Sequence, residues 1–181
     1  GIQFKGAMDP VQGIKDYVKI LEDKGFDERY EGWDEIYATV LKIAAAYEKN
    51  PPALGPCHND VLAENFMYDG TTMKLIDWEY GGQNDPYYDA AGPLTENEMD
   101  DEMTEVWLTS YFGGEPTEEE RARVMVGRFL YCTYWSVWSL VQMANGKERE
   151  IYWDYGLDRA KLGKAYMNDP KFADYLAIIS K

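Results

Sequence analysis

The chain has 181 residues, of which 45% are hydrophobic, and its 33 acidic against 18 basic residues give a formal net charge of −15. Without a cluster of Lys and Arg this composition argues against nucleic acid as a partner, and two cysteines with one histidine are too few for a disulfide framework or a zinc site. No apolar run reaches the length of a membrane span and no signal peptide begins the sequence, so we expect a cytoplasmic protein with no membrane partner.

Taken in chain order, the sequence predicts one mostly helical domain after residues 1–10, which resemble a vector-derived or linker segment. Apolar spacing predicts a helix that begins at Asp9 or Pro10 and a second helix over residues 33–49. Further helices are predicted over residues 87–97, 99–112, 117–144, 152–167 and 170–179. Short apolar runs at 66–68 and 73–78 predict a small β-hairpin as the only β element.

The polar residues that suggest chemistry lie around this predicted hairpin. His58 and Asp60 precede it, Asn65 follows Asp60 by five positions, and Asp77 ends the second apolar run. Phosphoryl transfer uses this set of residue types: one carboxylate accepts the proton of the attacking hydroxyl, while an amide and a second carboxylate hold the Mg²⁺ ions that bridge the ATP phosphates. Because antiparallel neighbours lie about 5 Å apart, the loop and the strand end can meet at one metal.

Each of these residues also has a purely structural interpretation. Asp and Asn commonly form turns, so Asp60 and Asn65 alone would be weak signals. Asp77 is harder to explain in that way, because a carboxylate at the end of an apolar strand costs free energy to desolvate unless a cation meets it. Glu64 and Glu79 fit equally well as outer contacts of a metal site or as solvated acids.

The full pattern, His-x-Asp-x4-Asn followed by Ile-Asp-Trp-Glu-Tyr, resembles the bacterial choline/ethanolamine kinase type in the aminoglycoside phosphotransferase and choline kinase superfamily. The resemblance implies the protein-kinase-like fold, with its C-terminal lobe in this chain and its N-terminal lobe missing. It implies a catalytic set of Asp60 as the base, Asn65, and His58 as a packing residue of the catalytic loop. It also implies Mg²⁺ ligands at Asn65, Asp77 and Glu79.

By the same resemblance, residues 11–181 divide into a catalytic loop at 55–65, a metal-binding hairpin at 66–80 and a helical choline-pocket subdomain at 86–181. The family's Asp-Pro-x-x-Asp turn has a counterpart that ends at Asp89. Asp89 fits there as a helix-start residue that braces the catalytic loop. Pro93 predicts a break in the helix that follows Asp89.

Aromatic residues in the C-terminal half suggest a pocket for an amine. Trp135 and Trp138 share a helix face, and Tyr155 follows downstream. A quaternary ammonium donates no hydrogen bonds, so proteins hold it with aromatic faces and a nearby carboxylate. The resemblance implies a cage of Tyr80, Trp135, Trp138 and Tyr155, with Glu96 facing the ammonium, although the break at Pro93 leaves the placement of Glu96 open. The alternative is that these aromatics belong to the core.

The resemblance also implies an ATP-binding lobe with a glycine-rich loop and a strand lysine, and neither pattern precedes His58. We therefore expect the parent protein to be an ATP- and Mg²⁺-dependent kinase for the hydroxyl of choline or a related amino alcohol. We expect this chain alone to be inactive or nearly so. Two alternatives stay open, namely a lobe of an aminoglycoside-type or other small-molecule kinase, and a non-catalytic choline-binding module.

Overall fold

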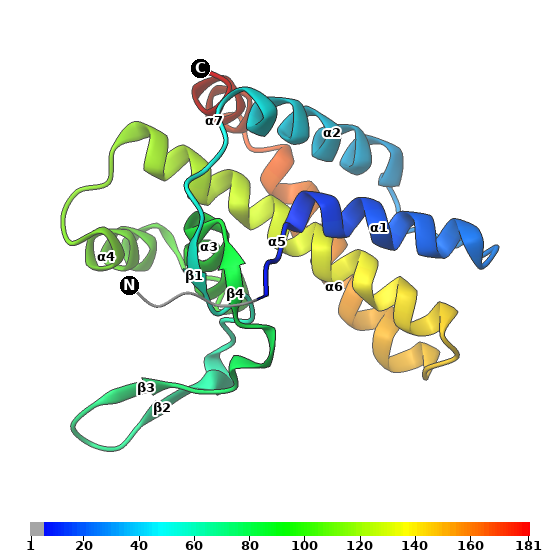
Figure 1. Ribbon diagram of the computed structural model, residues 1–181, viewed down its shortest axis with the longest axis horizontal. Coiled ribbons are helices and arrows are strands. Elements are labelled where there is room, and N and C mark those ends of the chain that lie inside the picture. Colours follow the sequence, from blue (N-terminus) through cyan, green and yellow to red (C-terminus); the bar gives the residue numbers. More distant parts are fainter. Residues whose placement is uncertain (1–5) are drawn as a thin grey trace.

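The computed structural model describes residues 6–181, and helices make up most of this part (Figure 1). The helices are α1 (Pro10–Asp23), α2 (Trp33–Lys49), α3 (Pro86–Glu96), α4 (Asp101–Phe112), α5 (Glu118–Ala144), α6 (Arg149–Met167) and α7 (Phe172–Ile179). The short elements are β1 (Gly55–Cys57), β2 (Phe66–Tyr68), β3 (Met73–Leu75) and β4 (Gly82–Asn84), with 3₁₀ turns η1 (Ala63–Asn65) and η2 (Trp78–Tyr80). No helix among residues 6–181 has both the length and the apolar character to cross a bilayer.

Helix α5 is the centre of the fold because it is buried around nearly its whole circumference. It contacts α1, α3, α6 and α7, which are arranged around it (Figure 1). A helix that is apolar on all sides is typical of such a core position. A capping box fixes its start, since the side chain of Thr117 accepts from the N–H of Glu120 and the side chain of Glu120 accepts from the N–H of Thr117. Helices α3 and α6, which carry candidate site residues, are therefore positioned by α5.

The remaining helix boundaries follow the sequence closely. Helix α1 begins at Pro10 as predicted, with Asp9 as its N-cap, and the Asp9 side chain accepts from the N–H of Gln12 at 2.9 Å. Helix α6 begins at Arg149, three residues before its predicted start. Helix α7 begins at Phe172, two residues after its own predicted start. Shifts of this size are ordinary at helix ends, where hydrogen bonding frays.

The predicted break at Pro93 is wrong, because α3 runs through this residue. Proline removes one hydrogen bond within a helix, which disfavours the helix locally. The helix is nevertheless pressed against α5, so closely that a Cβ added at Gly92 would lie 3.2 Å from the ring of Tyr131. Packing on α5 therefore outweighs the local preference, and Glu96 lies at the end of a continuous helix.

The strands form two separate antiparallel pairs. Strands β2 and β3 make the predicted hairpin, with Phe66 opposite Leu75, and this hairpin projects from the helical body (Figure 1). The expectation of a single β element is wrong, because β1 also pairs with β4, with Gly55 opposite Asn84. The Gly, Pro, Cys, Gln and Asn residues of these two strands have little strand propensity, so tertiary structure imposes the pairing.

The start of the described chain joins this second pair. The N–H of Met8 donates to the carbonyl of Gln83 at 3.0 Å, and the N–H of Gln83 donates to the carbonyl of Gly6 at 2.8 Å. Residues 1–5 of the predicted vector-derived or linker segment lie outside the described residues. Residues 6–8 thus lie alongside β4, next to the segment that leaves the hairpin.

Helices α5 and α6 approach closely at Gly156, and this contact gives a direct test of the packing. A Cβ added there would lie 1.8 Å from Ser139 Oγ and 2.2 Å from the hydroxyl of Tyr30. We expect Gly156→Ala to destabilise the fold by about 2 kcal/mol through overpacking, which corresponds to a melting temperature lower by about 4–8 °C. Gly114→Ala is the matched control, because a Cβ there meets nothing within 4 Å. Equal melting temperatures for the two variants in a thermal scan would contradict the packing described.

Candidate active site

His58 anchors the predicted catalytic loop. Its side chain is buried, its Nε2 lies 2.7 Å from the carbonyl oxygen of Ile76, and its Nδ1 accepts from the N–H of Asp60 at 3.3 Å. These contacts require the proton on Nε2, which donates to Ile76. The ring also lies 4.7 Å from that of Trp78. His58 therefore ties the loop to the segment that carries Asp77, in agreement with its predicted packing role.

Asp60 and Asn65 are brought together by a single turn. The chain folds through η1, where the N–H of Asn65 donates to the carbonyl of Leu62 at 3.1 Å. The buried Asn65 side chain then donates through Nδ2 to the backbone carbonyl of Asp60 at 2.9 Å. This hydrogen bond leaves Asn65 Oδ1 without a recorded partner among the described residues. The five-residue spacing is thus the length of one loop that closes on itself.

Asp77 caps the start of the exposed turn η2 and Glu79 lies within it, and both are close to Asp60. Burial raises the pKa of Asp60, and the negative charges of Asp77 and Glu79 raise it further. The expectation that Asp77 is desolvated at a strand end is wrong, because β3 ends at Leu75 and Asp77 is exposed. Its backbone adopts the left-handed region with φ of 62°, which aspartate tolerates better than most residues.

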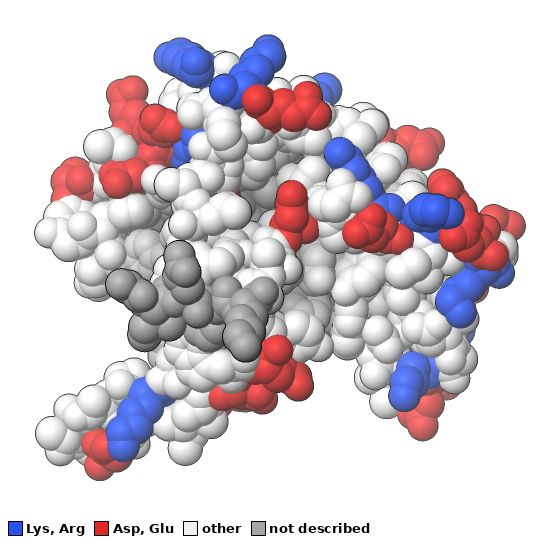
Figure 2. Space-filling model, in the orientation of Figure 1, with Lys and Arg blue, Asp and Glu red and all other residues white. Residues whose placement is uncertain are grey.

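Acidic side chains gather where the hairpin joins the helical body, on the face shown in Figure 2. No group of three or more His, Cys, Asp or Glu side chains within residues 6–181 is arranged to hold a metal ion. The predicted ligand set includes the amide of Asn65 together with Asp77 and Glu79. The structure therefore brings oxygen-bearing side chains into one region around Asp60 without forming a closed coordination shell.

Asp89 braces the predicted catalytic loop, as the sequence leads us to expect. One carboxylate oxygen accepts the N–H of His58 and the other accepts the N–H of Asn59, both at 2.6 Å. Helix α3 is capped by Asp85, whose side chain accepts from the N–H of Tyr87 at 2.9 Å, so Asp89 lies in the first turn rather than at the helix start. The two acids of the Asp-Pro-x-x-Asp turn thus have separate tasks, one for the helix and one for the loop.

Asn59 is a positioning residue that the sequence analysis missed. Its side chain is fully buried, donates to the carbonyl of Tyr80 at 2.7 Å and accepts from Asn84 Nδ2 at 2.8 Å. Its φ of 70° is left-handed, a conformation in which Asn is enriched among non-glycine residues. No periodicity marks such a residue, and only its place between His58 and Asp60 could have drawn attention to it.

The predicted cage residues form a continuous aromatic row. The ring centroids of Tyr80 and Trp135 are 5.8 Å apart, those of Trp135 and Trp138 5.5 Å, and those of Trp138 and Tyr155 6.1 Å. Trp135 is 5% exposed and Tyr80 is 40% exposed, so the row runs from the core to the surface. Burial raises the pKa of Tyr155 to about 12, and the charge of Asp60 contributes to that rise. The row therefore adjoins the candidate base.

Glu96 forms an ion pair with Arg159, a residue that the sequence analysis did not single out. The Arg159 guanidinium also lies over the ring of Tyr155, 4.2 Å from its centroid. Burial raises the pKa of Glu96, the charge of Arg159 lowers it, and the charges of Asp60 and Glu64 raise it. Tyr155 and Arg159 are four residues apart on one helix, a spacing that could have indicated the contact between the guanidinium and the tyrosine ring.

Comparison with known proteins places this arrangement in a family. The family described as choline/ethanolamine kinase matches residues 10–164. The chain belongs to the choline/ethanolamine kinase family. Among curated members, Protein LicA of Haemophilus influenzae is 28% identical over 163 residues, which cover 86% of this chain and 59% of LicA. The predicted resemblance to the bacterial choline/ethanolamine kinase type is confirmed.

Solved structures of choline/ethanolamine kinases share the fold. A family protein from Mesorhizobium loti superposes with a TM-score of 0.90 at 30% identity, covering 99% of this chain and 61% of that protein. Choline kinase LicA from Streptococcus pneumoniae superposes with a TM-score of 0.75 at 24% identity, covering 92% of this chain and 57% of that protein. The chain therefore spans about three-fifths of the length of these relatives.

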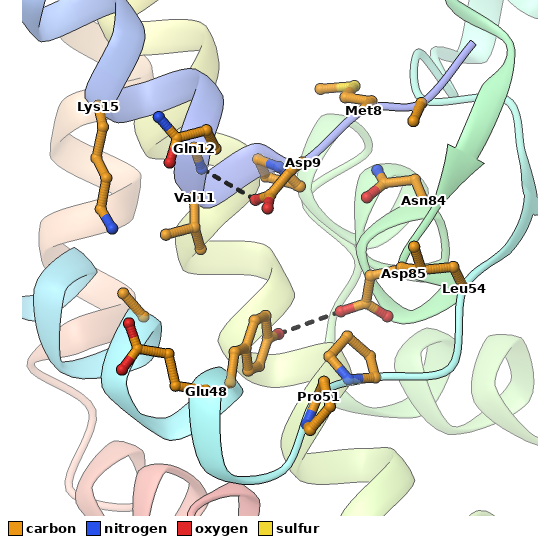
Figure 3. Close-up of a pocket in the computed structure, with 15 residues that line it drawn as sticks. Met8, Asp9, Val11, Gln12, Lys15, Glu48, Pro51, Leu54, Asn84 and Asp85 are labelled. Carbon is orange, nitrogen blue, oxygen red and sulfur yellow. Dashed lines mark hydrogen bonds between the residues drawn. The ribbon is translucent and has the colours of Figure 1, made fainter.

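The chain also has a cavity of about 500 Å³ between the start of α1, the end of α2 and the turn into α3 (Figure 3). None of the ten predicted site residues lines this cavity. Its wall includes the carboxylate of Asp85, which accepts a hydrogen bond from the hydroxyl of Tyr47 at 3.2 Å (Figure 3). Burial raises the pKa of Asp85 to about 6.

Asp85 predicts a specific pH dependence of stability. Because its pKa is higher in the folded state than its ordinary value of 3.8, the folded state binds more protons between these values. Lowering the pH from 7 to 5 should therefore stabilise the wild type by about 1 kcal/mol relative to Asp85→Asn, and this gain is lost as the pH rises through 6. Asparagine can still cap α3. Urea unfolding at each pH measures the difference, and parallel curves for the two proteins would refute it.

Proposed function

We propose that this chain is the catalytic lobe of an ATP- and Mg²⁺-dependent phosphotransferase that phosphorylates the hydroxyl of choline or a related amino alcohol. The observation that supports the proposal is that the Asp60 loop, the η2 turn and the aromatic row meet in one region. There the charge of Asp60 interacts electrostatically with Asp77, Glu79 and Tyr155. Membership in the choline/ethanolamine kinase family supports the same reaction class.

Asp60 is the proposed base. A carboxylate near the attacking hydroxyl orients it and accepts its proton during phosphoryl transfer. Asp60 is half-buried, and its raised pKa makes it a stronger proton acceptor than an exposed aspartate. His58 and Asp89 hold the backbone on which this carboxylate is carried. The loop therefore presents the base from a fixed position.

Asn65 and Asp77, with Glu79 beside them, are the proposed Mg²⁺ ligands. Magnesium prefers hard oxygen donors and needs few from the protein, because phosphates and water complete its octahedron. The side chains fit this need: Asn65 uses its Nδ2 for Asp60, which leaves Oδ1 available, and both carboxylates are exposed in η2. When bound, Mg²⁺ would neutralise charge on the phosphates.

Tyr80, Trp135, Trp138 and Tyr155 form the proposed wall for the ammonium group. Aromatic faces attract a cation without hydrogen bonds, and each contact contributes about 0.5–2 kcal/mol. The row adjoins Asp60, so an amine held there has its hydroxyl near the base. The domain division follows, with the catalytic loop at 55–65, the metal-binding hairpin at 66–80 and the amine pocket within 86–181.

The chain by itself should turn over slowly. The family resemblance assigns the glycine-rich loop and the phosphate-binding lysine to a further lobe, and neither pattern precedes His58 in the sequence. These groups hold the ATP phosphates and stabilise the charge of the transition state. In this proposal, tight ATP binding and full kinase activity therefore require a longer protein.

Amine binding tests the acceptor side of the proposal. In calorimetric titrations of the chain, we expect choline and ethanolamine to bind and kanamycin not to bind. Trp138→Ala should raise the choline Kd about 2- to 30-fold through the lost cation–π contact. Trp33→Ala is the control, because Trp33 is a partly buried tryptophan stacked on Tyr37 outside the row. Kanamycin binding tighter than choline would favour the aminoglycoside-type alternative. An equal change in the choline Kd for Trp138→Ala and Trp33→Ala would contradict the proposed wall.

Metal binding tests the catalytic side. Because a paramagnetic ion broadens nearby signals even at weak sites, we expect Mn²⁺, used as a probe for Mg²⁺, to broaden the amide NMR signals of Asn65, Asp77 and Glu79 selectively. Asp77→Asn should abolish this effect at equal Mn²⁺, whereas Asp27→Asn, an exposed loop control, should not change it. Uniform broadening over the acidic surface would contradict the assigned ligands. Choline affinity together with no selective broadening would favour the non-catalytic choline-binding module.

A further inference from the structure

The ion pair of Glu96 and Arg159 lies behind the aromatic row and joins two helices. Glu96 is the last residue of α3, and Arg159 comes from the middle of α6. Their side chains are only 10% and 18% exposed. The Arg159 guanidinium lies over the ring of Tyr155 as well, so one cation contacts both a buried carboxylate and the last residue of the row.

The position of Glu96 makes a basic partner necessary. The C-terminal end of a helix carries partial negative charge, which disfavours a carboxylate there, and burial adds a desolvation cost. Three charged groups shift the pKa of Glu96. The acidic Asp60 and Glu64, the latter from η1, raise it, and the basic Arg159 from α6 lowers it. The charge of Glu96 in turn raises the pKa of three neighbours, Tyr131 and the buried thiol of Cys132 on α5, and Tyr155 on α6. Arg159 is therefore the group that offsets these unfavourable contributions.

The same cation fixes the aromatic row at its far end. Tyr155 has Arg159 on one side and the ring of Trp138 at 6.1 Å, at an interplanar angle of 73°. The ion pair leaves Glu96 Oε1 and Arg159 Nε buried without a hydrogen-bond partner. The pair is therefore held by one hydrogen bond and is not bidentate, while the guanidinium lies over the tyrosine ring. This geometry indicates that contact with Tyr155 is part of what orients the guanidinium.

We propose that Arg159 is a positioning residue of the amine pocket, which holds Tyr155 against Trp138 and keeps the ionised Glu96 from adding uncompensated negative charge beside Asp60. Arg159 covers one face of Tyr155, so a substrate ammonium uses Trp135, Trp138 and the remaining side of Tyr155. This inference rests on the proposed function, because it takes the row to be the amine pocket.

The test compares Arg159→Met, Arg159→Lys and the double variant Arg159→Met/Glu96→Gln with a matched control. Arg149→Met is that control, because Arg149 lies on the same helix over the ring of Trp153 at 4.6 Å and pairs with Glu28, but is exposed. We expect Arg159→Met to weaken choline binding about tenfold at pH 5.5 by fluorescence titration, because Tyr155 is no longer held against Trp138 and choline loses about one cation–π contact with its ring. Arg149→Met should bind choline as the wild type does.

The pH dependence separates the charge of Arg159 from its packing. Without a partner, Glu96 should take up a proton more readily, and protonation removes a negative charge near the amine. Choline binding to Arg159→Met should therefore weaken more between pH 8 and pH 5.5 than binding to the wild type. The double variant should lose this extra slope, because its position 96 does not titrate. Arg159→Lys should lack the extra slope too, because it keeps the positive charge, yet it should bind choline more weakly since lysine lacks the planar group that lies over Tyr155.

Ligand-free measurements keep this inference distinct from the proposed function. Near-ultraviolet circular dichroism should report the loosened Tyr155–Trp138 contact in Arg159→Met and not in Arg149→Met, whether or not an amine binds. If the wild type binds neither choline nor ethanolamine, the proposed function fails while the dichroism still decides the positioning role. If Arg159→Met does not fold, the double variant and Arg159→Lys give the same comparison. Identical spectra and pH slopes for the Arg159 and Arg149 variants would overturn the inference.

Discussion

The carboxylate of Asp89 accepts hydrogen bonds from two consecutive backbone N–H groups, those of His58 and Asn59, in the loop that carries Asp60. Such a brace is only as rigid as the helix that carries it. Helix α3 lies against α5 at a distance that only glycine permits, since a Cβ at Gly127 would come within 3.0 Å of the Tyr87 carbonyl. The placement of Asp60 therefore depends on the packing of α3 against the buried helix α5. A change in the core between α3 and α5 would reach the site through this carboxylate.

The distribution of charge follows from the same arrangement. Asp60, Asp77 and Glu79 lie on a loop and a turn near one another, and among the ion pairs recorded for residues 6–181 none includes them. Like charges at this spacing raise the free energy of the folded state and raise the pKa of the most buried member, Asp60. A bound cation would relieve that repulsion. Glu96, the more deeply placed acid, is instead neutralised within the protein by Arg159.

Residue spacing predicted those parts of the structure that are local in the chain. The capping box at Thr117 and the loop from Asp60 to Asn65 each close over a few residues, so their patterns are readable in the sequence. What failed depends on contacts between distant segments. The pairing of β1 with β4 has no strand pattern, Pro93 is overruled by packing on α5, and Arg159 acquires its role only where α3 and α6 meet. The aromatic row was found because a family resemblance supplied the tertiary information that spacing lacks.

Asp60, the proposed base, and the aromatic row are joined by one buried amide. Asn59, next to Asp60 in the loop, donates to the carbonyl of Tyr80, the exposed end of the row. The other end of the row is carried by α5 and α6, which pack on each other throughout. The backbone of Tyr80 therefore cannot move relative to the Asp60 loop without breaking a buried hydrogen bond, and the rest of the row cannot move without disturbing the core. Under the proposed function, an aromatic wall and a base held in this way select substrates by the distance between the cation and the hydroxyl. The same proposal favours an amino alcohol with a short spacing, because a larger polycation could reach the acids without placing a hydroxyl at Asp60.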